Sequence, residues 1–265
     1  MKGKPIVLKL GGSVITNKKK SSTPNLKAIE RLANEISQAN LSSLILVHGG
    51  GSFGHPVAKQ YKINEGYVDP SQVIGFSEIH RVMAKLNSLV MEALMNHNIN
   101  AVVVQPSSCL VTKAGRIQNM ELEPIKRMLD LGLVPVLYGD AVLDSEKGFA
   151  ILSGDQLVSF LAINFGVSRI IMGADVDGIF TADPKAGSSA KLIQRVTLEE
   201  LKTHKHEING SKTIDVTGGM RGKMLELIPS VEQNIQTLIV NATKPSRVFK
   251  ALRGKEVIGT IIEKG

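Results

Sequence analysis

The sequence Ile6-Val7-Leu8-Lys9-Leu10-Gly11-Gly12-Ser13 joins a short apolar run to a pair of glycines. A run that is apolar at nearly every position is typical of a strand covered on both faces of its sheet. Paired glycines at the carboxyl end of a strand let the backbone approach an anion and leave N–H groups free to donate. Lys9 can place its ammonium beside the same anion. The stretch therefore predicts a buried strand that leads into a phosphate-binding turn, although an ordinary turn would explain the glycine pair alone.

Apolar runs of this kind recur along the chain and alternate with segments of helical periodicity. We expect strands at Ile6–Leu10, Leu44–Val47, Ala101–Val104, Val134–Leu137, Arg169–Met172 and Thr237–Val240. We expect helices at Asn25–Ala39, Phe76–Asn96, Glu123–Leu131, Gln156–Phe165 and Met220–Gln233. Such alternation predicts an α/β fold with a mainly parallel central sheet sandwiched between helices. The alternation continues through residues 165–170, so we expect a single domain over residues 1–265, built of two fused lobes that divide near there.

The composition is that of an ordinary soluble globular protein, with 265 residues, 43% hydrophobic and 21% charged. No stretch approaches the roughly 20 apolar residues that span a bilayer. The N-terminus lacks a signal-peptide pattern, so we expect no membrane partner and a cytoplasmic location. The single cysteine, Cys109, excludes an intramolecular disulfide and a Cys-based zinc site.

The formal net charge of +8 favours an anionic partner. The basic residues are scattered apart from Lys18-Lys19-Lys20, and aromatic residues make up only 4% of the chain. Proteins that bind single-stranded nucleic acid need aromatic side chains interleaved with basic ones. We therefore expect no nucleic-acid partner and favour a phosphorylated small molecule.

The second expected strand leads into His48-Gly49-Gly50-Gly51-Ser52-Phe53-Gly54-His55. Three consecutive glycines cost conformational entropy and contribute no packing, so something must require that backbone. Gly49, Gly51 and Gly54 also satisfy the G-x-G-x-x-G pattern of dinucleotide-binding folds. Pro56 directly after the loop, and the glycine turn that already closes the first strand, oppose that interpretation. The chain has no G-x-x-x-x-G-K-[ST] phosphate-loop pattern either.

Three further loops stand where an open α/β sheet binds ligands. Ser153-Gly154-Asp155 precedes an expected helix, and Asp155 occupies the place of a helix N-cap. Residues 173–184 carry acidic side chains, whose spacing differs from that of an EF-hand loop. Residues 217–223 open a helix with a glycine pair and place Lys223 one turn into it, which makes a second anion site.

Taken in order, these loops resemble those of the amino-acid kinase superfamily. The segments that carry the resemblance are Lys9–Ser13, Gly49–Gly51, Gly173–Pro184 and Gly218-Gly219-Met220 followed by Lys223. Within the superfamily, residues 48–55 and residues 9–16 followed by Lys18 are similar to the isopentenyl phosphate kinases of the archaeal mevalonate route. Fosfomycin kinases are similar in residues 48–55 and are the alternative. A non-catalytic nucleotide sensor of the same fold is a second alternative, and fold alone does not decide between them.

The resemblance implies ATP-dependent phosphorylation of isopentenyl phosphate to isopentenyl diphosphate. It assigns catalytic roles to Lys9, Lys18, His55, Asp155 and Lys223. Lys9 and Lys223 would bracket the transferred phosphoryl group, Asp155 would hold both lysines, and Lys18 would stabilise the transition state. Phosphoryl transfer needs positioning and charge neutralisation more than a strong base. A phosphate monoester is already a dianion at neutral pH, and His55 can donate to it.

The resemblance also implies which residues contact each ligand. Lobe 1–165 would bind the acceptor and lobe 166–265 would bind ATP, with Mg²⁺ on the phosphates and no metal ligand assigned to the protein. The acceptor phosphate would contact Gly50, His55 and Gly154. A homodimer is usual among relatives. The nucleotide would contact Lys9, Leu10, Gly11, Gly12, Ser13, Gly51, Asp175, Phe180, Thr181, Ala182, Asp183, Pro184, Lys185, Gly219 and Lys223.

The tail of a five-carbon acceptor needs an apolar wall beside its phosphate. The expected helix Phe76–Asn96 follows the His55 loop closely enough to form one. We hypothesise that Val82, Met83 and Leu86 on its apolar face line the tail pocket. The alternative is that these residues only pack against the sheet.

Overall fold

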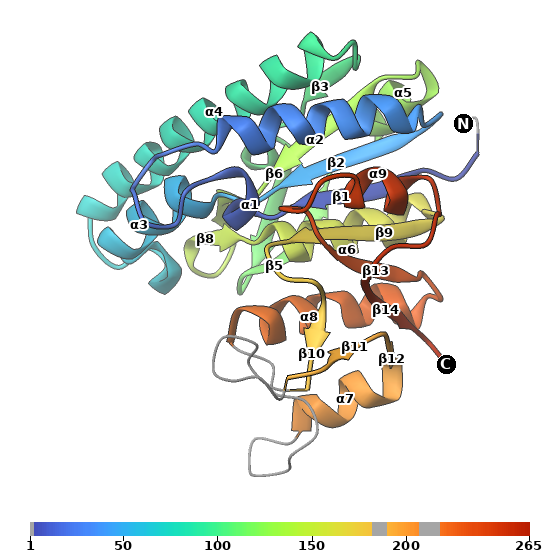
Figure 1. Ribbon diagram of the computed structural model, residues 1–265. Coiled ribbons are helices and arrows are strands. Elements are labelled where there is room, and N and C mark those ends of the chain that lie inside the picture. Colours follow the sequence, from blue (N-terminus) through green and yellow to red (C-terminus); the bar gives the residue numbers. More distant parts are fainter. Residues whose placement is uncertain (1–2, 182–189, 207–217) are drawn as a thin grey trace.

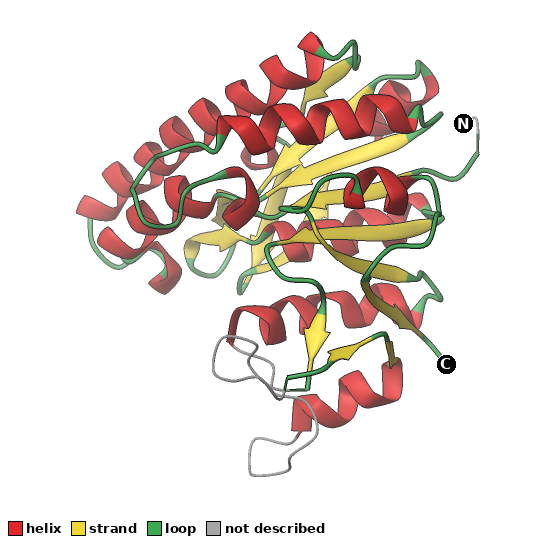
Figure 2. Ribbon diagram, viewed as in Figure 1, coloured by secondary structure: helices red, strands yellow, loops and turns green. Residues whose placement is uncertain are grey.

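The computed structural model describes residues 3–181, 190–206 and 218–265. Their backbone forms a mainly parallel sheet with helices on both faces, which confirms the predicted fold class (Figure 2). Neighbouring strands of the sheet pair in parallel except β13 with β14, which are antiparallel. In spatial order the strands are β12 (Arg195–Thr197), β14 (Gly259–Glu263), β13 (Thr237–Asn241), β9 (Arg169–Ala174), β1 (Ile6–Leu10), β2 (Leu44–His48), β6 (Val134–Tyr138) and β3 (Ala101–Val103).

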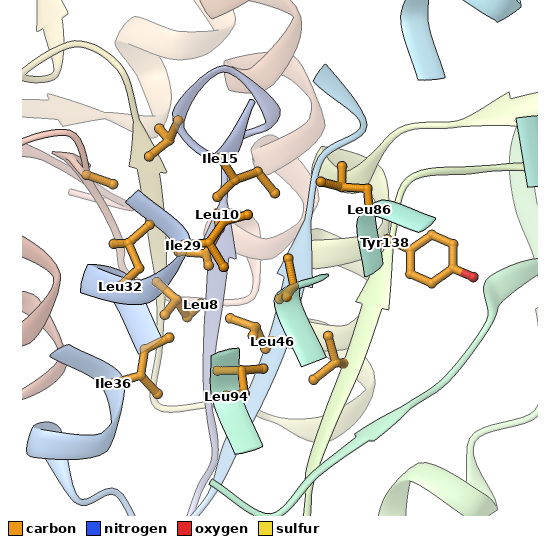
Figure 3. Close-up of a cluster of buried hydrophobic side chains, with 14 of the residues drawn as sticks. Leu8, Leu10, Ile15, Ile29, Leu32, Ile36, Leu46, Leu86, Leu94 and Tyr138 are labelled. Carbon is orange, nitrogen blue, oxygen red and sulfur yellow. The ribbon is translucent and has the colours of Figure 1, made fainter. Parts of the chain in front are cut away.

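Helices cover both faces of the sheet, and the sheet divides the hydrophobic core into two parts (Figure 1). The core of one face packs beneath α2 (Leu26–Ala39), α4 (Ser71–Asn96) and α9 (Arg247–Leu252). Figure 3 shows part of this core, where Leu8 and Leu46 of the sheet meet Leu32 and Leu94 of the helices. The core of the other face packs beneath α5 (Glu123–Asp130), α6 (Gly154–Phe165), α7 (Leu198–His206) and α8 (Gly218–Glu232).

The alternation of side chains along β1 decides where Lys9 points. Successive residues of a strand face opposite sides of the sheet. Leu8 and Leu10 lie in the core beneath α2 and α4, whereas Val7 lies in the core beneath α6. Lys9 shares the face of Val7, so its side chain is directed to the side where α6 begins.

A second, four-stranded sheet was not expected from the sequence. Its order is β5-β4-β7-β8, and β4 and β5 form an antiparallel hairpin with a register shift after Val111. Exposed and polar side chains interrupt strands β4 and β5, so these two lack the continuous apolar runs of the central sheet. The strands are β4 (Leu110–Lys113), β5 (Arg116–Met120), β7 (Asp140–Asp144) and β8 (Gly148–Leu152).

Helix boundaries differ from the expected ones at places where glycine or proline obscured the pattern. The helix expected from Phe76 begins at Ser71, and the glycine-rich stretch after β2 becomes helix α3 (Gly51–Gln60) with Pro56 inside it. The remaining short elements are α1 (Gly12–Ile15), η1 (Ile63–Glu65), η2 (Pro106–Ser108), β10 (Ile179–Phe180) and β11 (Leu192–Ile193). Among the described residues, no helix is both long and apolar enough to cross a membrane.

Candidate active site

Asp155 joins the ends of three elements that lie far apart in sequence. Its Oδ1 accepts a short hydrogen bond from Nζ of Lys9, at the end of β1. Its Oδ2 accepts a hydrogen bond of 3.0 Å from Nζ of Lys223, on α8. The side chain of Lys9 is buried and that of Asp155 is 13% exposed, whereas that of Lys223 is 32% exposed. The three predicted residues therefore lie together, with one carboxylate between two ammonium groups.

The environment of this group changes how its members ionise. Burial lowers the pKa of Lys9 to about 8, against the opposing attraction of Asp155. Burial also opposes the ionisation of Asp155, but the charges of Lys9 and Lys223 hold the pKa of its carboxyl below the usual range. Asp155 is therefore ionised at neutral pH, and Lys9 titrates within the range in which enzymes work.

Asp155 is not the N-cap of α6, contrary to the interpretation of its sequence position as a capping site. Ser153 occupies that position, and its side chain accepts a hydrogen bond from the backbone N–H of Gln156. Asp155 lies inside the first turn, so its carboxylate points to the two lysines. Gly154 lies between Ser153 and Asp155 in the chain, and a Cβ on it would lie 3.3 Å from Cε of Lys9. A side chain at residue 154 would therefore press on Lys9.

The glycines after β1 and β2 are required first by each other. A Cβ on Gly12 would lie 2.3 Å from the backbone nitrogen of Gly51, and one on Gly49 would lie 2.7 Å from the nitrogen of Gly12. Gly51 has a φ of +48°, and a Cβ on it would meet Oγ1 of Thr16 at 2.1 Å. The two loops thus pack backbone against backbone, and larger residues would separate them.

Leu10 and Gly11, both predicted nucleotide contacts, are also held by neighbouring loops. The carbonyl of Leu10 accepts a hydrogen bond of 3.0 Å from the N–H of Gly49, and its side chain is buried in the core. The N–H of Gly11 donates to the carbonyl of Gly173 at 2.8 Å. Gly12 and Ser13 open helix α1, where N–H groups have no partner within the helix itself.

His55 lies on the exposed side of α3, in the first turns of a helix rather than in a loop. Its partial burial and the positive charges of Lys223, Lys9 and Lys18 lower the pKa of its imidazole. These three lysines are therefore close enough to act on His55 through space. The positive charges of three ammonium groups thus act on one imidazole, which indicates an environment suited to a multiply charged anion.

Asp175 connects the turn after β1 to the basic segment that follows it. Its Oδ1 accepts a hydrogen bond of 2.9 Å from Oγ of Ser13, and its Oδ2 accepts one of 2.8 Å from Nζ of Lys18. Burial opposes its ionisation, but the hydrogen bonds from Lys18 and Ser13 keep the pKa of its carboxyl below the usual range. Three residues assigned to the site from the sequence, Ser13, Lys18 and Asp175, are thus in direct contact.

The predicted tail-pocket residues of α4 differ in their position. Val82, Met83 and Leu86 are all buried among the side chains of one core. Met83 alone reaches the glycine loop, because a Cβ on Gly50 would lie 3.0 Å from its Sδ and one on Gly54 would lie 3.1 Å from it.

The remaining predicted nucleotide contacts are only partly covered by the structure. Phe180 ends the short strand β10, and the backbone N–H of Thr181 donates to the carbonyl of Lys191 at 2.9 Å. Gly219 lies in the first turn of α8. Ala182, Asp183, Pro184 and Lys185 lie outside the described residues.

His48 is a structural residue of the site that the sequence alone did not indicate. It is fully buried at the end of β2, and burial lowers the pKa of its imidazole to about 4. Its Nδ1 lies 3.2 Å from the carbonyl of Gly49, and its Nε2 lies 3.1 Å from Nδ2 of Asn87 on α4. The neutral ring therefore donates to Gly49 and accepts from Asn87, which fixes the start of the glycine loop. Its place directly before three glycines was the available signal.

Metal-ligating side chains do not gather in the described part of the chain, where no group of three or more His, Cys, Asp or Glu residues could hold an ion. Asp155 and Asp175, the carboxylates nearest the predicted phosphate site, are each paired with lysine.

The chain resembles known proteins over nearly its whole length. The model of the amino acid kinase family matches residues 4–241. The isopentenyl phosphate kinase of Methanothermobacter thermautotrophicus is 41% identical, with 97% of this chain and 98% of that protein covered. The isopentenyl phosphate kinase of Methanocaldococcus jannaschii is 37% identical, with 97% and 98% covered.

Solved structures give the same result. A crystal structure of an isopentenyl phosphate kinase superposes with a TM-score of 0.86 at 39% identity and covers 97% of this chain and 99% of its own. A substrate complex of an isopentenyl phosphate kinase superposes with a TM-score of 0.79 at 29% identity, with 98% and 100% covered. The chain therefore belongs to the amino acid kinase family, among relatives that are isopentenyl phosphate kinases.

Proposed function

We propose that the protein transfers the γ-phosphoryl group of ATP to isopentenyl phosphate and so forms isopentenyl diphosphate and ADP. The observation that carries the proposal is the pair of ammonium groups of Lys9 and Lys223 held on the single carboxylate of Asp155. A reaction between two phosphate groups brings a large negative charge to one place. Such a reaction requires cations held in fixed positions, as they are here near the carboxyl ends of central strands.

In the proposed reaction, a phosphate oxygen of the acceptor attacks the γ-phosphorus as the bond to the β-phosphate oxygen breaks and ADP leaves. Lys9 and Lys223 would donate to the transferred phosphoryl group from two sides, held in position by Asp155. Lys18 would leave Asp175 to neutralise charge on the same group in the transition state. The acceptor is already a dianion at neutral pH, so no side chain need remove a proton.

His55 would donate a hydrogen bond to the acceptor phosphate, together with the backbone of Gly50 and Gly154. In the free protein, partial burial and then the positive charges of Lys223, Lys9 and Lys18 lower its pKa, so the ring is neutral at neutral pH. A bound dianion would raise that pKa, because an opposite charge favours the protonated form. Binding of the acceptor is therefore expected to protonate His55, with the proton taken from the solvent.

On the nucleotide side, the backbone of Gly11 to Ser13, with that of Gly51, would hold the ATP phosphates. Asp175 and the stretch from Phe180 to Lys185 would lie around the rest of the nucleotide, and Gly219 would contact it from α8. Mg²⁺ bound to ATP would neutralise part of the charge on its phosphates. We assign the acceptor to the lobe of residues 1–165 and ATP to the lobe of residues 166–265. The turns at Gly11 to Ser13 and at Gly51 belong to the first lobe and would contact the ATP phosphates from there. The homodimer and the cytoplasmic location stay predictions.

The test is an ATP-consumption assay with isopentenyl phosphate, dimethylallyl phosphate, fosfomycin and carbamate as separate acceptors. The proposal expects the highest kcat/KM with isopentenyl phosphate, in agreement with similarity over nearly the full length of isopentenyl phosphate kinases. A preference for fosfomycin would favour the phosphonate-kinase alternative. ATP binding without turnover of any acceptor would favour a nucleotide sensor.

A further inference from the structure

The β4–β5 hairpin is tied to helix α8 by an ion pair that the proposed reaction does not use. Nη1 and Nη2 of Arg116, at the start of β5, donate to Oε1 and Oε2 of Glu226 at 2.7 and 2.9 Å. This paired geometry fixes the orientation of both side chains better than a single contact does. The carboxylate of Glu226 is only 22% exposed, although the arginine is 59% exposed.

Gln156 ties the same hairpin to helix α6. Its buried side-chain amide accepts a hydrogen bond of 2.8 Å from the N–H of Ile117 and donates one of 3.0 Å to the carbonyl of Gly115. Gln156 directly follows Asp155 in the first turn of α6. The hairpin is thus held against the turn that carries the central carboxylate of the site.

The turn of the hairpin is itself fixed by Asp144. The buried carboxylate of Asp144 accepts hydrogen bonds from the N–H groups of Gly115 at 2.7 Å and Ala114 at 3.2 Å, and from the hydroxyl of Thr112 at 2.8 Å. Ala114 and Gly115 both have positive φ angles. Hydrogen bonds to a buried carboxylate hold this turn in one conformation, so the hairpin can serve as a rigid support.

These contacts close a ring that contains Lys223. Lys223 and Glu226 are three residues apart on α8 and therefore lie on one side of the helix. Asp155 holds the first of them and Arg116 the second, while Gln156 joins Arg116's strand back to Asp155's helix. Lysine has a long, flexible stem, and Lys223 is partly exposed, so a second attachment on the same side of α8 restricts where its ammonium can lie.

We propose that Arg116 and Glu226 are positioning residues for phosphoryl transfer, which set the distance of Lys223 from the reacting phosphates by clamping α8 to the β4–β5 hairpin. The proposal rests on the proposed function, in which Lys223 acts on the transferred group. It predicts that breaking the clamp slows the chemical step while both substrates still bind, since small misplacements of a catalytic group cost rate rather than affinity.

The experiment compares Arg116→Ala, Glu226→Ala and the double variant with the wild type. Each single variant should lower kcat roughly tenfold, with KM for ATP and for isopentenyl phosphate changed less than about threefold. The double variant should be no slower than the slower single variant, because both substitutions remove the same clamp. The single variants also separate position from charge. If the pair acts as a clamp, kcat falls in both Arg116→Ala and Glu226→Ala. If the pair acts only through its charges on Lys223, kcat changes in opposite directions in the two variants.

Two controls make the result specific. Arg195→Ala removes a comparable pair, in which Arg195 is 65% and Glu263 31% exposed and which joins β12 to β14. It should leave kcat unchanged. The melting temperature of all variants should stay within about 3 °C of the wild type, because exposed ion pairs contribute little to stability.

A second readout does not depend on turnover. Acetylation of Lys223 by trace acetic anhydride, measured by mass spectrometry relative to the exposed Lys27, should speed up in both clamp variants and not in Arg195→Ala. Wild-type kcat and wild-type acetylation of Lys223 in Arg116→Ala and Glu226→Ala would overturn the proposal. Absence of wild-type activity on isopentenyl phosphate would instead overturn the proposed function, while the acetylation still tests the clamp.

Discussion

Lys223 donates a hydrogen bond of 3.0 Å to Asp155, although the two residues are 68 positions apart and lie on different helices. The other oxygen of the same carboxylate binds Lys9. Asp155 therefore fixes the spacing of two ammonium groups that come from opposite ends of the chain.

Removal of either lysine should impair the chemical step far more than the fold. We expect Lys9→Ala or Lys223→Ala to lower kcat by roughly 10²-fold, the scale of losing one transition-state donor. Asp155→Asn keeps the shape of the side chain but removes the charge between the lysines, so it should also reduce kcat. Steady-state kinetics, with circular dichroism as a control for folding, measure this. Wild-type kcat in a folded Lys9→Ala or Lys223→Ala protein would show that the lysines have another role.

The pH dependence of activity should reveal the titration of Lys9. Its pKa in the folded protein is about 8, below the ordinary lysine value of 10.5, and the protonated form is the one that can donate to phosphate. We therefore expect kcat/KM for ATP to be level below about pH 8 and to fall above it, since this profile reports groups of the free enzyme.

Stability should change in the opposite sense over that range. Between about pH 8 and 10.5 the unfolded chain binds more protons at Lys9 than the folded chain does, so this group's contribution to the free energy of unfolding rises with pH. Loss of activity above pH 8 is therefore not expected to result from Lys9-linked unfolding. In Lys9→Arg the guanidinium stays charged, and the fall near pH 8 should disappear whatever the residual rate.

His55 should recognise the acceptor phosphate rather than ATP. We expect His55→Ala to abolish most transfer while calorimetry shows little change in ATP affinity. Acceptor binding to the wild type at pH 7.5 should take up protons, because the dianion raises the pKa of His55, which partial burial and the lysines lower in the free protein. Titrations in two buffers of different ionisation enthalpy measure that uptake, with His55→Gln as the non-titrating control. Loss of ATP binding with an unaltered KM for the acceptor would reverse the assignment.

Trimming the proposed tail wall should widen acceptor choice, and Met83 should matter most. The sulfur of Met83 faces Gly50 and Gly54, whereas Val82 and Leu86 are buried in the core. Each additional buried CH₂ contributes about 0.8 kcal/mol, so space for a ten-carbon tail can be worth several kcal/mol. We expect Met83→Ala to raise activity on geranyl phosphate relative to isopentenyl phosphate by about tenfold or more. Val82→Ala and Leu86→Ala, with melting temperatures recorded, serve as comparisons, and an unchanged ratio in all three would place the wall elsewhere.

The sequence predicted the central sheet well because its signal is local. The run Ile6–Leu10 forms β1 with the predicted bounds, and the capping side chain of Asn25 starts α2 where the pattern indicated. Side-chain alternation along β1 then places Lys9 on the side of α6, so the position of one catalytic candidate follows from period and burial alone.

Other parts of the fold could not be predicted because long-range contacts decide them. Helix α3 forms over Gly51 to Gln60 despite its glycines and Pro56, since Phe53 is buried and Gly51 must fit against Gly12. Strands β4 and β5 are short and partly exposed, so their pairing in the second sheet has no strong signal in the local sequence. Local propensity is a weak guide where tertiary contacts override it.

The candidate site shows the same division. Glycine loops and lysines could be located from sequence, but the partner of each charge could not. Ser153 rather than Asp155 caps α6, which leaves the aspartate available to the lysines. Arg116 and Glu226 lie 110 residues apart and belong to no motif, so only the folded chain brings them together.

The central claim is that phosphate is transferred to phosphate, and the structure of the product tests it most directly. Wild-type protein, ATP, Mg²⁺ and isopentenyl phosphate should be followed by ³¹P NMR, with Asp155→Asn as the comparison. The account predicts that the acceptor's single phosphorus resonance is replaced by two coupled resonances of a diphosphate, in equal amount to the ADP formed, at a much lower rate in the variant. Release of inorganic phosphate without a coupled diphosphate signal, or an unchanged acceptor resonance while ATP persists, would contradict it.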